Sequence, residues 1–148
     1  MTEEVPSAVA LSKNDFDKDI NLTSNKCKSK TIILFYSPGC GHCLKLKDDY
    51  EALAKAAMNG QLGNDVTVAV INTADNMELM KMIHDPEKMD QREFLVQGVP
   101  TIVSYKDGKY YSTYGIGDSK EEKDNFRKTS DMAEFVQGVG SAPITYTK

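Results

Sequence analysis

Two cysteines separated by two residues, Cys40-Gly41-His42-Cys43, are the residues of this sequence best suited to chemistry. They come shortly after an apolar, strand-like run at residues 31–36 and open a segment with helical spacing. A cysteine at the start of a helix lies beside unpaired backbone N–H groups and the positive end of the helix dipole, which stabilise its thiolate. The thiolate is the form that attacks disulfides, so this spacing indicates thiol–disulfide exchange.

His42 lies between the two cysteines, where a partly protonated imidazole adds positive charge beside the sulfur. That charge favours the reduced thiolate and makes the disulfide a better oxidant. Metal sites use the same Cys-x-x-Cys spacing, but they need about four ligands. The other candidates are Cys27, His42 and His84, and there is no second Cys-x-x-Cys. We therefore predict a redox-active pair and no metal, with a structural metal site or an inert pair as the alternatives.

Length and composition favour one globular domain. The chain has 148 residues, of which 40% are hydrophobic, and its net charge of −4 argues against nucleic-acid binding. No run approaches the roughly 18 apolar residues of a membrane span, and the first residues resemble no signal peptide. We expect no membrane partner. The expected location is cytoplasmic or otherwise intracellular if the chain is complete, and lumenal if it is a mature fragment.

Hydrophobic patterns predict two buried strands with a helix between them. Residues 31–36 and 65–72 are rich in β-branched side chains, as strands buried on both faces are. The apolar residues between them recur at helical spacing and end at an Asn-Gly pair: Leu46, Tyr50, Leu53, Ala57, then Asn59-Gly60.

The first residues predict smaller elements. Residues 5–11 contain Pro6 and predict an edge strand at best. Ser12 and Asp15 have the spacing of a capping box, which predicts a short helix to about Leu22.

In the second half of the chain, residues 75–85 predict a helix with Met77, Met80 and Ile83 on one side. Residues 101–105 and 109–114 predict a hairpin that turns at Asp107-Gly108. A charged insertion at residues 117–128 follows, and Ser130 then predicts the cap of a final helix. Strands that alternate with helices, followed by an antiparallel pair, predict an α/β fold with a mixed sheet. Its central strands should be parallel, and the C-terminal hairpin antiparallel.

This order of elements, with a cysteine pair at the end of a central strand, resembles the thioredoxin fold. The resemblance is carried by residues 35–43 (FYSPGCGHC), residues 98–101 (GVPT), Tyr114 and the final helix. The Cys-Gly-His-Cys core is similar to that of the active domains of protein disulfide isomerases. The match covers about residues 5–140. It implies a single three-layer α/β/α domain over residues 1–148.

The resemblance also implies roles: Cys40 as nucleophile, Cys43 as resolving thiol, His42 as modulator of the potential, and Gly39, Gly41, Val99, Pro100 and Thr101 as substrate-binding residues. The Val99-Pro100 bond resembles the family's cis-proline, which costs only about 0.5–1 kcal/mol and exposes the preceding backbone to a substrate strand. The alternative is a trans proline that begins a strand. The cysteine pair would itself be the redox cofactor, and no other is implied.

Four positions depart from the family pattern. The family's buried acidic residue, which relays a proton to the second cysteine, is Leu34 here, and its lysine partner is Val70. The acidic residue and its lysine partner are expected to be lost together, because either charge left alone in the core would cost several kcal/mol. It implies that Cys43 is deprotonated less efficiently. Gly39 replaces an aromatic residue before the first cysteine, and Asp48 replaces a helix-kinking proline.

Other residues keep two interpretations. Arg127 resembles an arginine that swings toward the second cysteine and modulates it, or it is a solvated side chain. Cys27 is either a loop thiol without a function or a resolving or intermolecular cysteine. The first interpretation predicts a monomer, and the second allows a dimer through Cys27. Four methionines are interpreted as core and helix-surface residues, with a client-binding patch as the alternative: Met77, Met80, Met82 and Met89.

Two functional hypotheses remain. The first is a thiol–disulfide oxidoreductase acting on protein thiols and disulfides, with a redox partner that the residues do not identify. The second is a catalytically weakened binding or structural protein that holds a partner in the groove near Pro100.

Overall fold

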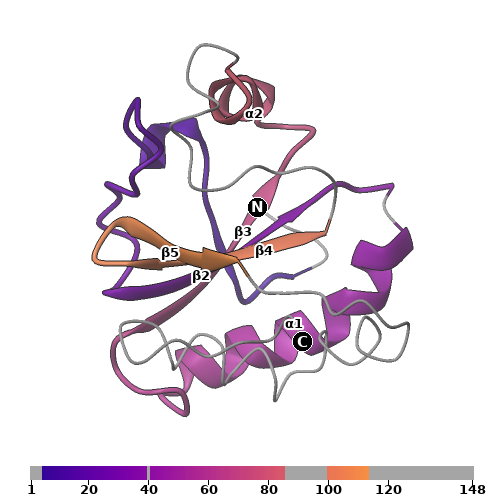
Figure 1. Ribbon diagram of the computed structural model, residues 1–148. Coiled ribbons are helices and arrows are strands. Elements are labelled where there is room, and N and C mark those ends of the chain that lie inside the picture. Colours follow the sequence, from indigo (N-terminus) through magenta and orange to yellow (C-terminus); the bar gives the residue numbers. More distant parts are fainter. Residues whose placement is uncertain (1–4, 40, 86–99, 114–148) are drawn as a thin grey trace.

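In the part of the chain that the structure describes, five strands form one mixed sheet with one α-helix on each face (Figure 1). The computed structural model describes residues 5–39, 41–85 and 100–113, apart from the side chains of residues 41–45 and 112. The strands are β1 (Val9–Ala10), β2 (Lys30–Tyr36), β3 (Val66–Asn72), β4 (Thr101–Lys106) and β5 (Lys109–Thr113). Their order across the sheet is β1-β3-β2-β4-β5, with β1, β3 and β2 parallel and the β4–β5 hairpin antiparallel. The predicted fold class is confirmed.

The central strand β2 is buried on both faces, as its apolar sequence predicts. Leu34 packs in the cluster that includes the buried residues of α1 (Gly41–Met58). Ile33 and Phe35 point to the other face, toward the cluster that includes α2 (Met77–Ile83). Successive side chains of a strand alternate between faces, so one run of apolar residues supplies both cores.

The packed face of α1 follows the predicted spacing. Leu46, Tyr50, Leu53 and Ala57 are all buried against the sheet. Gly60, two residues beyond the helix, has a φ of 76°, the left-handed conformation in which helices commonly end. The predicted helix and its end are confirmed.

The two edges of the sheet also behave as predicted. At one edge β1 is only two residues long and pairs with β3. At the other edge Asp107 and Gly108 join β4 to β5 with φ values of 51° and 85°. Two consecutive positive φ angles are the signature of the type I′ turn that Asp-Gly favours.

The segment between β1 and β2 is less helical than predicted. The Asp15 carboxylate accepts a hydrogen bond from the Ser12 backbone N–H at 2.8 Å, as in a capping box, but the helix is a single 3-10 turn, Lys13–Asp15. Beyond it the Asp17 carboxylate accepts backbone N–H bonds from the turn that follows. Such local bonds compete with helix formation, so the prediction of a helix to about Leu22 is wrong.

The helix α2 packs through other residues than predicted. Leu79 and Ile83 are fully buried, whereas Met80 is half-buried and Met77 is 63% exposed. The prediction that Met77 shares the packed side with Ile83 is wrong. The helix begins two residues later than predicted, because the Asn72 side chain accepts backbone N–H bonds from the turn before it.

The charged insertion at residues 117–128 and the helix expected after Ser130 lie outside the described residues. None of the helices in the described ranges has the length and apolar character needed to cross a membrane.

Candidate active site at the carboxyl edge of the sheet

The ends of β2 and β3 meet at one edge of the sheet. The backbone N–H of Thr73, which follows β3, donates to the Tyr36 carbonyl at 2.8 Å, and the Thr73 hydroxyl lies 3.1 Å from the same oxygen. From Tyr36 the chain turns through residues 37–39 and enters α1 at Gly41. The Cys-Gly-His-Cys sequence therefore spans the junction between a central strand and a long helix, which sequence analysis predicted.

The start of β4 lies at the same edge. Thr101, the first residue of β4, is the antiparallel partner of Phe35 near the end of β2. Pro100 directly precedes it, and both residues are half-buried. The fold thus brings Pro100 and Thr101 beside the turn that leads to Cys40, although about sixty positions separate them in the sequence.

The remaining predicted site residues are described only in part. Gly39 is exposed, and a side chain added there would meet nothing within 4 Å. Gly41, His42 and Cys43 form the first residues of α1, and their side chains lie outside the description. Cys40, Val99 and Arg127 lie outside the described residues, as does the Val99-Pro100 peptide bond.

Leu34 and Val70, the two residues that depart most from the family pattern, are direct partners across β2 and β3. They are 2% and 0% exposed and belong to the same apolar cluster. Among the described residues, Asp15 is the one buried carboxylate, and it belongs to the N-terminal capping box. No described carboxylate therefore lies in the core next to Leu34, and none of the described acidic residues could act there as a proton relay.

Tyr50 is the one ionisable side chain of α1 that is fully buried within the described residues. Its hydroxyl donates to the Ala69 carbonyl at 2.7 Å and lies 3.3 Å from the Ile32 carbonyl. Burial raises the pKa of Tyr50 well above its ordinary value, which keeps the phenol neutral. The helical spacing of the sequence predicts only a packing role for Tyr50. Tyr50 also ties α1 to the strands, and a tyrosine on the packed face of an amphipathic helix is the available signal for that role.

Cys27 lies at the opposite end of the sheet from the Cys40 junction. It precedes β2 and lines a surface cavity together with Ser29, which also precedes β2, and Gly108, which lies in the hairpin turn. Burial is the largest influence on this thiol and raises its pKa to about 11. A thiol with a raised pKa carries little thiolate near neutral pH, so the environment of Cys27 disfavours a resolving or intermolecular role.

Cys27 is expected to be alkylated by iodoacetamide about a hundredfold more slowly in the folded protein than in the unfolded chain at pH 8, since only the thiolate reacts. Its pKa rises from 9.0 to about 11 on folding, so the unfolded chain releases this proton first as the pH increases. Stability is therefore expected to fall between about pH 9 and pH 11. Peptide mapping by mass spectrometry gives the labelling rate, with urea-unfolded protein as the reference. Equal rates in the two states would contradict this environment.

The fold and the site define a class of protein: an α/β domain with a Cys-x-x-Cys sequence between a central parallel strand and the helix that follows it. The family model described as Thioredoxin matches residues 7–129, and the chain belongs to the thioredoxin family.

Its relatives include protein disulfide isomerases, as the resemblance predicted. A thioredoxin domain-containing protein of Theileria parva is 28% identical over 142 residues, which cover 96% of this chain and 55% of that protein. Protein disulfide-isomerase of Saccharomyces cerevisiae is 33% identical over 85 residues, covering 57% of this chain and 13% of the relative. The first thioredoxin domain of mouse protein disulfide-isomerase A4 shares the fold with a TM-score of 0.60 at 23% identity, covering 98% of this chain and 82% of that one. The chain thus spans about half of the length of the Theileria parva protein and a much smaller part of the length of the Saccharomyces cerevisiae protein.

Proposed function

We propose that this chain exchanges disulfides with protein substrates through Cys40 and Cys43. The observation that carries the proposal is the junction itself: the turn at residues 37–39 leads from the end of β2 into a helix of 18 residues that begins at Gly41. Cys40 immediately precedes that first helical residue in the sequence. Unpaired N–H groups at a helix start stabilise a thiolate, so the nucleophile would be Cys40.

The exchange conserves atoms and electrons. The Cys40 thiolate attacks one sulfur of a substrate disulfide, which forms a mixed disulfide and releases the other substrate sulfur as a thiolate. The Cys43 thiolate then attacks the Cys40 sulfur and releases the second substrate thiol. The substrate is reduced and the cysteine pair is oxidised, and the reverse sequence oxidises a substrate. The pair itself carries the electrons, so the step calls for no further cofactor.

Substrate binding is assigned to Gly39, Gly41, Val99, Pro100 and Thr101. The pairing of Thr101 with Phe35 supports this assignment, because it brings the start of β4 to the end of β2. An extended substrate segment could pair with backbone there and hold its sulfur near Cys40. Arg127 remains a candidate modulator of Cys43.

Deprotonation of Cys43 is expected to depend on water. Leu34 and Val70 face each other in the apolar core, and neither can accept or donate a proton. The second exchange step should therefore be slower than in a domain with a buried carboxylate at position 34.

Cys43→Ser is expected to accumulate mixed disulfides with substrate proteins, because Cys40 can attack but no second thiol can release the product. Cys40→Ser is expected to accumulate none. Non-reducing gel electrophoresis after acid quenching measures both, and a sample treated with dithiothreitol confirms that each adduct is a disulfide. Equal trapping by the two variants would refute the assignment of nucleophile and resolving thiol.

His42→Pro is expected to make the pair more reducing by tens of millivolts, at about 30 mV per 1.4 kcal/mol, because it removes the positive charge that favours the Cys40 thiolate. The wild-type potential should lie nearer the value of about −180 mV for protein disulfide isomerase than the value of about −270 mV for thioredoxin. Proline is tolerated at the second position of α1, where the N–H has no helical partner. Equilibration with glutathione buffers gives both potentials. An unchanged potential would remove His42 from the mechanism.

A binding or structural role is the second candidate, and the apolar Leu34–Val70 pair is the observation that favours it. In that case the groove near Pro100 would hold a partner without turnover. Titration of the cysteine pair against glutathione separates the two. A defined exchange equilibrium with turnover of a disulfide substrate supports the oxidoreductase, and slow exchange without turnover supports the binding protein.

A further inference from the structure

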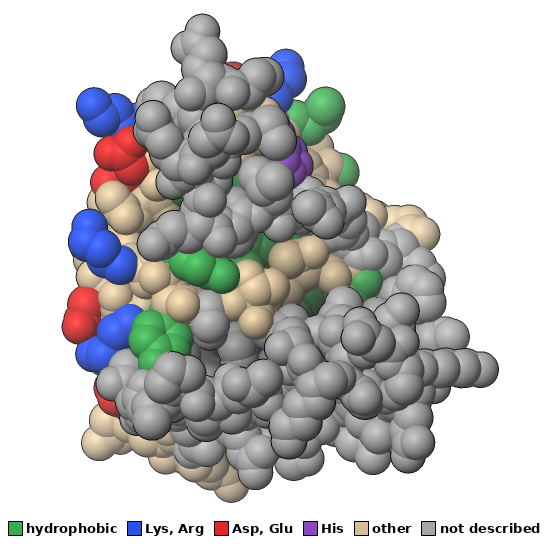
Figure 2. Space-filling model, in the orientation of Figure 1, with side chains coloured by type: hydrophobic (Ala, Val, Ile, Leu, Met, Phe, Trp, Pro, Cys, Tyr) green, Lys and Arg blue, Asp and Glu red, His purple; other side chains and the backbone are tan. Residues whose placement is uncertain are grey.

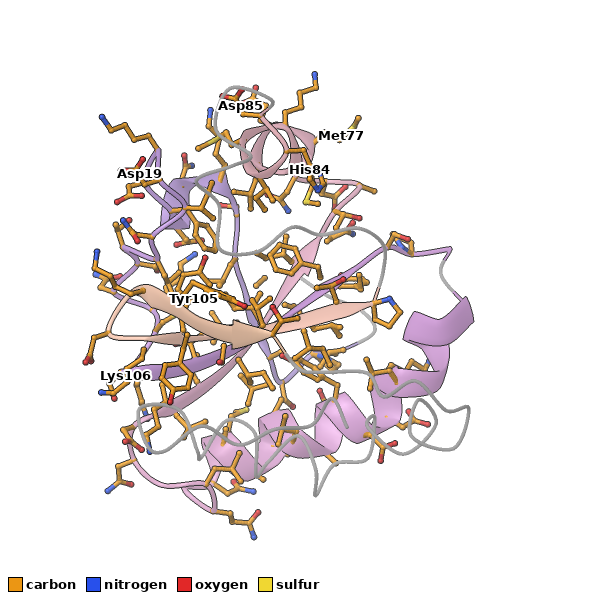
Figure 3. The ribbon with its side chains drawn as sticks, viewed as in Figure 1. Asp19, Met77, His84, Asp85, Tyr105 and Lys106 are labelled. Atoms are coloured by element: carbon orange, nitrogen blue, oxygen red, sulfur yellow. The ribbon has the colours of Figure 1, made fainter. Side chains whose placement is uncertain are left out.

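The outer surface of α2 borders an apolar cavity. Five residues line this α2 cavity, which has a volume of about 460 Å³: Thr73, Met77, Met80, Lys81 and His84. Met77 is 63% exposed and is one of two large hydrophobic side chains, with Met58, that stand out in solvent within the described residues. Figure 3 places Met77 and His84 next to each other at α2, and Figure 2 shows the histidine at the surface of the same region.

The α2 cavity lies at the same edge of the sheet as the candidate active site. Thr73, which lines it, is bonded through its backbone N–H to the carbonyl of Tyr36. Tyr36 is the last residue of β2 and stands four positions before Cys40. A polypeptide segment whose cysteine reaches Cys40 can therefore extend over α2.

The side chains around the α2 cavity favour an apolar residue with an acidic neighbour. Met77 and Met80 supply flexible thioethers, which adapt to side chains of different shape. Lys81 and His84 contribute positive charge or N–H donors, and none of the lining residues in the described part of the chain is acidic. Glu78 on the same helix is bound by Lys13 at 2.7 Å, and Lys81 also attracts its carboxylate.

We propose that the α2 cavity binds the substrate polypeptide by enclosing a bulky apolar side chain next to an acidic one. This inference rests on the proposed function for its substrate, a protein that contains the exchanging cysteine. It makes α2 a specificity element: segments with an apolar-acidic pair near the cysteine are preferred over segments that are polar or basic there.

The test measures binding without exchange. Three fluorescent synthetic peptides carry serine in place of the substrate cysteine, followed by Leu-Glu, Ser-Glu or Leu-Lys, and fluorescence anisotropy gives each Kd. The wild-type chain is expected to bind the Leu-Glu peptide about tenfold more tightly than either of the other two, because each loses one of the two contacts.

Variants then locate the binding. Met77→Gln is expected to abolish the preference for Leu over Ser, and Lys81→Gln to reduce the preference for Glu over Lys. Met58→Gln is the matched control, since Met58 is 71% exposed at the far end of α1 and should keep both preferences. Equal binding of the three peptides, or a preference for Leu over Ser that survives Met77→Gln, would overturn the inference. A concentration-dependent dimer that Met77→Gln disrupts, without peptide binding, would assign the cavity to a second copy and also overturn it.

Exchange is measured separately, with glutathione disulfide as the probe. A chain that binds the serine peptides selectively but does not exchange with glutathione disulfide would refute the proposed function and keep the cavity as a binding site. A chain that exchanges with glutathione disulfide but shows no peptide preference would refute substrate binding at the α2 cavity and leave the proposed function intact.

Discussion

Leu34→Glu is expected to lower the free energy of unfolding by about 1–3 kcal/mol, the cost of placing an unpartnered polar group in an apolar core. Leu34 is 2% exposed, and its partner across the sheet is Val70, which is fully buried. The new carboxyl group would avoid the charge by a raised pKa. The loss should therefore be smaller below about pH 4, where the unfolded chain is also protonated, and should grow as the pH rises through the pKa of the folded state.

The control substitutions separate charge from shape. Leu34→Met keeps the position apolar at a similar volume and is expected to cost less than about 1.5 kcal/mol. Adding Val70→Lys to Leu34→Glu should recover part of the loss, because the two positions are in register on adjacent strands and an ion pair can form. Urea denaturation at two pH values measures all three. An unchanged midpoint for Leu34→Glu would show that position 34 is not in the core.

Gly108→Ala is expected to destabilise the fold by about 2–4 kcal/mol, for two separate reasons. Gly108 has a φ of 85°, which an L-residue adopts only with strain. A Cβ atom there would also lie 2.5 Å from the carbonyl oxygen of Leu22, far inside van der Waals contact. The Leu22 backbone N–H donates to the Gly108 carbonyl at 2.8 Å, so moving the two segments apart would break a hydrogen bond.

Gly60→Ala is the matched control for that prediction. Gly60 has a similar φ of 76°, but the nearest atom to an added Cβ is the Asn64 side-chain oxygen at 3.9 Å. Its substitution should cost only the backbone term, about 1–2 kcal/mol. The difference between the two variants in thermal or urea denaturation isolates the contact between the hairpin and Leu22. Equal losses would mean that this close approach contributes nothing.

The sequence by itself determined the elements that depend on neighbours along the chain. The run at residues 31–36 became the buried strand β2, the spacing from Leu46 to Ala57 became the packed face of α1, and Asp107-Gly108 became the hairpin turn. The junction that holds the Cys-Gly-His-Cys sequence is local in the same sense. Apolar periodicity and turn chemistry act over a few residues, so they can be read without the fold.

Tertiary structure decided what depends on contacts between distant segments. It buried Leu79 and Ile83 of α2 while leaving Met77 in solvent. It also set the register that places Leu34 opposite Val70, and the burial that raises the pKa of Cys27. Burial and register arise only when strands and helices pack together, because the free energy of each contact depends on which surfaces the whole chain removes from water.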